Sequence, residues 1–292
     1  MSNALSPAAS PYVGPRWRLR RASAIPGFGP AFGYTILYLT FIVLLPLAAL
    51  VIKASGLGLS GWWVAVTDER VLAALKTSFG LSLAAALVDS AFGLLVAWVL
   101  TRYQFPGRRI LDAVIDLPFA LPTAVAGIAL AALYAPNGWI GRLVEPLGLK
   151  IAFTPLGIFV ALVFVGLPFA VRTVEPLIAE MDRELEEASA TLGATRTQTV
   201  WKTVIPPLVP AVLTGFALAF ARAVGEYGSV IFIAGNMPYV SEIAPLLIVI
   251  KLEEFNYAGA TAIATIMLAI SFGTLLLINL LQAYTRRRYG HV

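Results

Sequence analysis

The sequence has no cysteine and a single histidine, His291, next to its last residue. Without cysteine there is no disulfide and no thiolate that could bind a metal or attack a substrate. One histidine leaves little basis for a histidine metal site or a Ser-His catalytic system. The phosphate-binding motif Gly-x-x-x-x-Gly-Lys-Ser/Thr does not occur. We therefore expect a chain that is not an enzyme and that binds no cofactor, metal or nucleotide itself.

Charged residues are also scarce. They make up 13% of the 292 residues, whereas about a quarter is usual in a soluble domain. Hydrophobic residues make up 59%, and the mean hydropathy is +0.84. Apolar stretches long enough to cross about 30 Å of hydrocarbon recur along the chain. This composition indicates an all-α membrane protein, in which the net charge of +5 reports loop orientation. No nucleic-acid partner is expected.

The apolar stretches predict about six transmembrane helices, at residues 32–52, 78–100, 110–133, 155–174, 207–234 and 260–284. Residues 1–30 are expected to form a loose tail, and residues 31–71 the first helix with an outer loop. Residues 72–285 are expected to form the main transmembrane domain, and residues 286–292 a basic tail. Pro118 and Pro122 interrupt the third span and are interpreted either as an ordinary kink or as a hinge.

The Lys and Arg residues orient these spans. With both termini in the cytoplasm, fourteen of the 21 Lys and Arg residues lie on the inner side and six on the outer side, and Arg222 lies within the membrane. Cytoplasmic loops carry the excess of positive charge in membrane proteins. The sequence therefore predicts cytoplasmic termini and a cytoplasmic location for the loop at residues 182–207.

That loop is a polar island between two apolar blocks, so it must lie outside the hydrocarbon. Asp182 can cap a short helix, acidic residues fill its first turn, and Gly193 can end it. A second short helix is expected at residues 196–204, with a new helix beginning at Pro206 and Pro207. Two short helices tethered to spans at both ends form an element that can dock on another protein and transmit its motion.

The residues of this loop resemble the "EAA" loop of permease subunits in binding-protein-dependent ABC importers. The matching residues are Glu187, Ala188, Ser189, Gly193, Ala194, Trp201, Ile205 and Pro206. Ser189 replaces the usual Ala, and Ile205 replaces the usual Leu. The resemblance covers roughly residues 72–285 and implies a type I ABC importer permease fold. It also implies that these residues, Trp201 apart, couple the permease to an ATPase dimer that uses ATP and Mg, and that a periplasmic binding protein delivers the substrate.

Residues 220–228 and 232–236 resemble the oxyanion permeases for sulfate and molybdate. Residues 252–258 and the ending with Arg287, Arg288 and His291 are more similar to the sulfate/thiosulfate permeases of the "T" type, whose usual partner is a second permease of the "W" type. The resemblance implies sulfate import across the bacterial inner membrane. A molybdate or tungstate importer, an ion-gradient-driven anion transporter and an intramembrane enzyme remain alternatives, and the docking loop favours the ABC importer.

Several charged residues lie within the expected spans. Arg222 and Glu226 are four residues apart and can pair on one helix face. They form either an anion pathway or gate, in which Glu226 holds the arginine, or a structural ion pair. Asp89 is interpreted as a packing residue or, alternatively, as a proton relay. Asp112 and Asp116 are interpreted as interfacial. A charge at mid-membrane usually faces the bundle interior or water.

Overall fold

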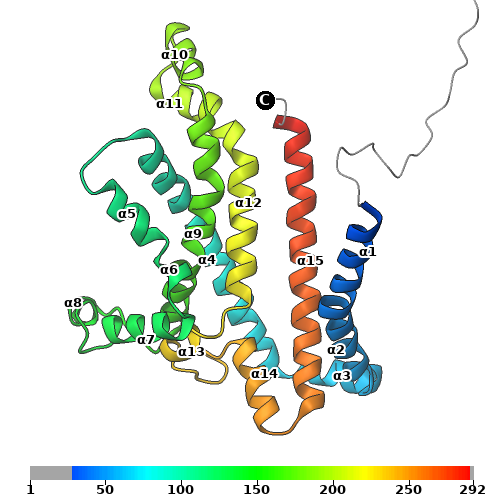
Figure 1. Cartoon of the computed structure of the whole chain (residues 1–292). Coiled ribbons are helices and arrows are strands. Elements are labelled where there is room, and N and C mark those ends of the chain that lie inside the picture. The colour runs from blue at the N-terminus through cyan, green and yellow to red at the C-terminus, as the bar shows by residue number, and fades with distance from the viewer. Residues whose placement is uncertain (1–27, 290–292) are drawn as a thin grey trace, which may run out of the picture. The chain divides into compact units, whose positions relative to one another are not determined.

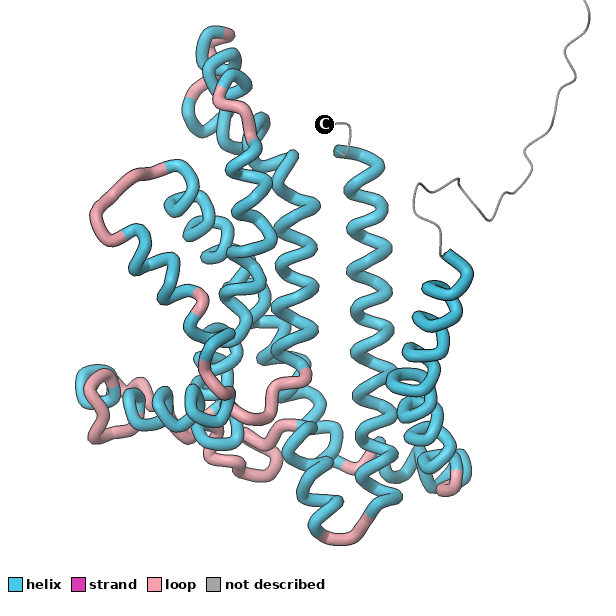
Figure 2. Tube along the Cα trace, in the orientation of Figure 1, coloured by secondary structure: helices cyan, strands magenta, loops and turns pink. Residues whose placement is uncertain are grey.

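The computed structural model describes the backbone of residues 28–289 and the side chains of residues 28–284. In this part of the chain, helices are joined by short loops and no strand occurs (Figure 2). The chain divides into two compact units, residues 1–49 and 50–292. An apolar helix begins at Phe28, inside the expected tail of residues 1–30, and residues 1–27 lie outside the described part.

Five helices among the described residues are long and apolar enough to span a membrane. The elements that form them are α1 (Phe28–Leu39) with a π-helical turn (Thr40–Leu44) and α2 (Leu45–Ser55); α4 (Glu69–Arg102); α9 (Pro155–Glu180); α11 (Arg196–Thr199) with a π-helical turn (Val200–Val204) and α12 (Ile205–Val224); and α15 (Tyr257–Tyr289). At 1.5 Å per residue, even α9 extends about 39 Å, more than the hydrocarbon core requires. The expected all-α membrane fold is confirmed. α15 also continues into the expected C-terminal tail of residues 286–292.

The expected third span, residues 110–133, is not a single helix. It consists of α5 (Arg108–Ile115), α6 (Leu117–Ala120) and α7 (Thr123–Tyr134), and α7 runs crosswise to α9 and α12 (Figure 1). Pro122 causes the second break, because a proline forces the residue before it into extended backbone. That residue, Leu121, has φ −87° and ψ 134°. The expected interruption at Pro122 is confirmed, and it divides the segment rather than only kinking it.

The expected helix break before Pro206 and Pro207 is also wrong. One helix runs from Arg196 to Val224, through the π-helical turn at Val200–Val204. In that turn the Ile205 N–H donates to the Val200 carbonyl, five residues back. The wider turn lets a helix continue next to prolines, which cannot donate their own backbone hydrogen bonds.

The fifth span ends earlier than expected. α12 stops at Val224 with Gly225 as its C-cap, so Glu226 lies in the following turn. A separate short helix, α13 (Val230–Ile233), completes the region expected to be helical up to residue 234. Arg222 is in the last turn of α12 and Glu226 just beyond it.

The core of the second unit is built where α4, α9 and α12 pack on small residues. A Cβ on Gly93 of α4 would lie 2.6 Å from the Ala170 Cβ of α9, and one on Gly215 of α12 would lie 3.1 Å from the Ala170 Cα. A Cβ on Gly166 of α9 would clash with Asp89 of α4. Small residues let helices approach this closely. Going along α4 from Asp89 to Gly93, the neighbours on α9 go from Gly166 to Ala170, so α4 and α9 run in the same direction. The neighbours of these two α9 residues on α12 go from Ala219 back to Gly215, so α12 runs in the opposite direction.

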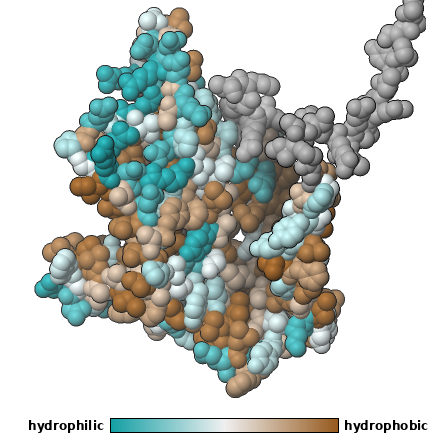
Figure 3. Space-filling model, viewed as in Figure 1, coloured by the Kyte–Doolittle hydropathy of each residue, from teal (hydrophilic) through white to brown (hydrophobic). Residues whose placement is uncertain are grey.

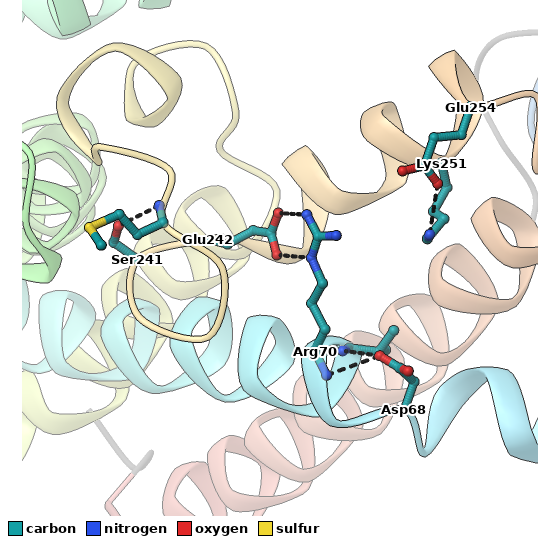
Figure 4. A network of polar contacts seen from close by, with 8 residues as sticks. Asp68, Arg70, Ser241, Glu242, Lys251 and Glu254 are labelled. Atoms are coloured by element: carbon teal, nitrogen blue, oxygen red, sulfur yellow. Dashed lines mark hydrogen bonds and ion pairs between the residues drawn. The ribbon is translucent and has the colours of Figure 1, made fainter.

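Short elements lie at the end of the second unit that is opposite the loop at residues 182–207 (Figure 1). They are α3 (Gly58–Val66), α8 (Gly141–Val144), a 3-10 turn (Glu145–Leu147) and α14 (Ala244–Glu253). At this end Arg70 donates from Nε and Nη2 to both oxygens of buried Glu242, at 2.8 and 2.7 Å (Figure 4). Asp68 caps α4, and a hydrogen bond from Lys251 lowers the pKa of exposed Glu254.

Candidate coupling loop and membrane ion pair

The first short helix of the loop, α10 (Glu184–Thr191), begins within one residue of the position that the sequence predicts, with Arg183 rather than Asp182 as its N-cap. Asp182 Oδ1 accepts a hydrogen bond from the Glu184 N–H at 3.0 Å. Three glutamates lie in the first turn, where negative charge interacts favourably with the helix dipole. Local sequence therefore determines where α10 starts, independently of what the helix contacts.

The end of α10 is also as predicted. Gly193 has φ +81°, a left-handed conformation that glycine adopts without strain. The Gly193 N–H donates to the Ala190 carbonyl at 3.0 Å, and the Ala194 N–H donates to the Ser189 carbonyl at 3.1 Å. These two bonds form the Schellman motif that ends many helices. The role of Gly193 as a helix terminator is confirmed, and its role in coupling stays a prediction.

The second half of the loop is held by its own cap and by a contact to α10. Thr195 and Gln198 form a capping box, in which each side chain accepts from the backbone N–H of the other residue, at 3.4 and 2.9 Å. The hydroxyl groups of Ser189 and Thr203 lie 2.9 Å apart and join α10 to the π-helical turn. Ser189, which departs from the usual Ala, therefore has a specific contact.

An ion pair joins α10 to the end of α4. Arg102 Nη2 lies 3.0 Å from Glu186 Oε1 and also donates to the Met181 carbonyl at 3.3 Å. The guanidinium carbon of Arg102 lies 5.2 Å from the centre of the Trp98 ring. Sequence reasoning missed this connection, although a charged residue at a helix end and another on α10 were both visible. It links the loop to the three-helix core.

A groove of about 570 Å³ lies between the loop and α4. Its walls include Leu94, Trp98, Glu186, Ala194, Ile205 and Leu208. On the outer surface of the loop, Glu187 and Ala188 are exposed, and the large side chains of Leu192 and Trp201 are 88% and 67% exposed. Figure 3 shows that this end of the molecule is largely hydrophilic with scattered apolar residues. Such a surface can dock on a protein outside the membrane.

The second candidate site is the pair formed by Arg222 and Glu226. Arg222 Nη1 pairs with Glu226 Oε2, and Glu226 Oε1 accepts from the N–H and Oγ of Ser229 at 2.9 and 3.0 Å. The Glu226 side chain is 2% exposed, whereas that of Arg222 is 32% exposed. The carboxylate is thus held by two residues, and the Arg222 side chain remains partly exposed. The predicted pair is confirmed, and its function is not.

The turn that carries Glu226 packs directly against α7. A Cβ on Gly228 would clash with the Thr123 side chain, and one on Gly127 would clash with the Ser229 backbone. The break at Pro122 therefore has a consequence for the site, because it places the start of α7 against this turn. Sequence reasoning missed Ser229 and Thr123.

The remaining intramembrane acids have two different environments. Asp112 and Asp116 both pair with Arg172 of α9, at 2.8 and 2.7 Å, and Arg172 also pairs with Glu175 at 2.6 Å. They hold α5 against α9, which the interpretation as interfacial residues missed. Asp89 is buried, and neither of its carboxyl oxygens has a hydrogen-bond partner.

Comparison with known proteins places the chain in a family. The family described as "Binding-protein-dependent transport system inner membrane component" matches residues 89–291, which is more than half of the chain. The match includes both the loop at residues 182–207 and the Arg222–Glu226 pair. The chain belongs to this family.

Named relatives are similar to the permease over nearly its whole length. The "Sulfate transport system permease protein CysT" of Synechocystis sp. is 50% identical over 277 residues, covering 95% of this chain and 97% of the relative. The protein of the same name from Escherichia coli is 47% identical over 268 residues, covering 91% of this chain and 97% of the relative.

Solved structures support the fold of the permease. A chain of a bacterial alginate ABC transporter, in complex with a periplasmic protein bound to an alginate pentasaccharide, has a TM-score of 0.71 and 17% identity. It covers 89% of this chain and 94% of the solved chain. A chain of the MetNI methionine ABC transporter has a TM-score of 0.51 and 20% identity, covering 76% and 99%. At these identities the likeness concerns the fold alone, which is that of a type I ABC importer permease.

Proposed function

We propose that the permease is the transmembrane subunit of an ATP-driven importer. The importer moves sulfate into the cytoplasm and also accepts thiosulfate as a substrate. The observation that carries this proposal is the 50% identity to a sulfate transport permease over 95% of the chain. The family and these relatives make the chain a transport component rather than an enzyme. Similarity along the full length favours sulfate over molybdate or tungstate as the substrate.

The importer needs partners. The proposed partners are an ATPase dimer that hydrolyses ATP with Mg, a periplasmic sulfate/thiosulfate-binding protein and a second permease of the "W" type. The family description, which names a binding-protein-dependent system, supports the binding protein. Five apolar helices of sufficient length support a multi-pass location in the inner membrane. The excess of Lys and Arg on the inner side supports cytoplasmic termini.

In this proposal α10 is the coupling helix. Glu187 and Ala188 are exposed and available to the ATPase, and Gly193 fixes the angle at which α10 leaves the loop. Motion of α10 would reach α4 through Arg102 and Glu186. The continuous helix from residue 196 to 224 would carry the same motion to the Arg222–Glu226 pair.

Arg222 is proposed to attract the dianion. A guanidinium in a spanning helix is costly against lipid, so its open face must meet water or another protein surface. The Arg222 side chain is 32% exposed and pairs with Glu226, which Ser229 holds in place. An arginine fork can bind two oxygens of a tetrahedral oxyanion at once, as it does with phosphate. Membrane lipid would cover the outer faces of the bundle.

Uptake of radiolabelled sulfate in a strain that lacks its sulfate permeases tests the proposal. Expression of this chain with its partner subunits should restore uptake, and unlabelled thiosulfate should compete more strongly than molybdate. The matched control is the same system with Gly193→Val, which changes the loop and leaves the spans intact. Restored molybdate uptake without sulfate uptake would refute the substrate assignment.

A further inference from the structure

Asp89 is buried where three helices meet. It lies on α4, against Gly166 of α9, and Ala219 of α12 is also close, because a Cβ on Gly166 would lie 3.5 Å from the Ala219 Cβ. Both carboxyl oxygens lack a hydrogen-bond partner among the described residues, although most buried polar groups in proteins have one. A buried acid without a protein partner needs an explanation that packing alone does not supply.

Arg222 lies about one helical turn along α12 from Ala219, the α12 residue near Asp89. Ala219 and Arg222 are three residues apart on α12, which is about 4.5 Å along the axis and on neighbouring parts of the same face. Helical side chains point toward the N-terminus of their helix. The usual direction of Arg222 therefore leads toward the level of Asp89. In the structure the guanidinium instead turns the other way, to Glu226.

No other charged group on α9 or α12 is available to Asp89 among the described residues. Arg222 is the only charged residue of α12. The charged residues of α9 are Arg172, Glu175 and Glu180, and Arg172 is already bound by Asp112, Asp116 and Glu175. On α4 the same buried face carries Ser82, which is polar but not ionisable near neutral pH and also has no partner.

We propose that Arg222 exchanges carboxylate partners during transport, binding Glu226 in the state described here and Asp89 in another state of the cycle. This inference rests on the proposed role of Arg222 in anion transport. While Arg222 is bound to Glu226, Asp89 is a neutral acid. When the guanidinium moves, one proton passes from Asp89 to Glu226 through water, so the three groups keep a total charge of zero. No charge is then left buried and unpaired in either state.

The exchange has a direct consequence for the anion. In the present state the Arg222 side chain is 32% exposed, and under the proposed function the dianion binds its guanidinium in this state. Turning toward Asp89 brings the guanidinium into the contact of α4, α9 and α12. The dianion then loses its cationic partner and is released. Asp89 is thus assigned as a positioning residue, which acts on the anion through Arg222.

Asp89→Asn tests the exchange, because asparagine keeps the shape of the side chain but cannot carry the negative charge. We expect sulfate uptake to fall at least tenfold, with the yield of the complete complex unchanged. Asp68→Asn, on the same helix, is the matched control, since asparagine caps a helix as well as aspartate. In an Arg222→Gln background, Asp89→Asn should cause no further loss, because the two residues act on one step.

The outcomes separate this inference from the proposed function. If Arg222→Gln lowers uptake and Asp89→Asn leaves uptake within twofold of the wild type, the pathway role of Arg222 stands and the exchange is wrong. Additive losses in the double variant also overturn it. Normal uptake by Arg222→Gln refutes the pathway role itself.

A measurement on the unmodified protein covers the case in which Asp89→Asn fails to assemble. Infrared difference spectra of the whole complex, recorded with and without trapped ATP, report protonated carboxyl groups. The exchange predicts that one such band is lost and another appears at a shifted position, and that neither change occurs in Arg222→Gln. An unchanged carboxyl spectrum in the wild type would refute the exchange.

Discussion

Replacing Gly193 by valine disfavours the backbone conformation that ends α10 and removes no side-chain contact of the coupling loop. At φ +81° a residue with a Cβ incurs a cost of about 1–2 kcal/mol, and a β-branched side chain lies at the upper end. No atom lies within 4 Å of the Cβ position, so no clash adds to this conformational cost. A loss of 1–2 kcal/mol lowers the fraction of correctly formed loop relative to its alternatives by about 5–30-fold.

The predicted result is a comparable loss of ATPase co-purification and of sulfate uptake, with normal insertion of the chain into the membrane. Gly193→Asn is the matched control, because asparagine tolerates the left-handed conformation, and it should keep most of the activity. If the valine variant shows normal uptake and normal co-purification, the loop does not couple ATPase and permease in the way described.

Three further predictions concern other parts of the account. A cysteine at Ser189 should be labelled from the cytoplasmic side only, and one at Asn137 from the opposite side only. Glu226→Ala should lower complex yield, because Arg222 and Ser229 lose their partner, but by less than the cost of about 3–5 kcal/mol for a fully buried pair, since the Arg222 side chain is 32% exposed. Adding Arg222→Ala should restore part of the yield without restoring uptake. Glu186→Gln should cost about 1 kcal/mol in docking of the loop and increase hydrogen exchange in α10.

A specific result would contradict each of these three predictions. The cysteine-free chain makes single-cysteine labelling unambiguous, and labelling of both positions from one side contradicts the orientation. Full uptake by the Arg222→Ala, Glu226→Ala double variant would leave the pair as packing only. Arg222→Lys, which keeps the charge but loses the planar fork, should be partly active. Unchanged exchange in Glu186→Gln would show that the contact to α4 does not hold α10.

The elements that sequence reasoning predicted correctly depend on local chemistry. Asp182 and Gly193 mark the two ends of α10, because capping and the left-handed conformation are decided by residues within one or two turns. The long apolar helices follow from composition in the same way. The pair of Arg222 and Glu226 follows from a spacing of four residues.

The elements that it missed depend on contacts between distant residues or on backbone adjustments with weak signals. The prolines at 118 and 122 were visible, but a proline can kink a helix or divide it, and the residue pattern alone does not decide which. The helix continues through Pro206 because of the π-helical turn at Val200–Val204, and no residue type in that turn predicts it. The partners of Arg102 and Arg172 come from other helices, so no local pattern identifies them.

The central claim is that ATP hydrolysis outside this chain drives sulfate through it, by way of the loop that contains α10. Purified permease, its partner permease and ATPase should be reconstituted in proteoliposomes, with the binding protein and radiolabelled sulfate supplied on the outer side of the permease. Accumulation should require MgATP, remain after ion gradients are collapsed, and be abolished or strongly reduced by Gly193→Val but not by Gly193→Asn. Accumulation driven by an ion gradient without ATP would contradict the account.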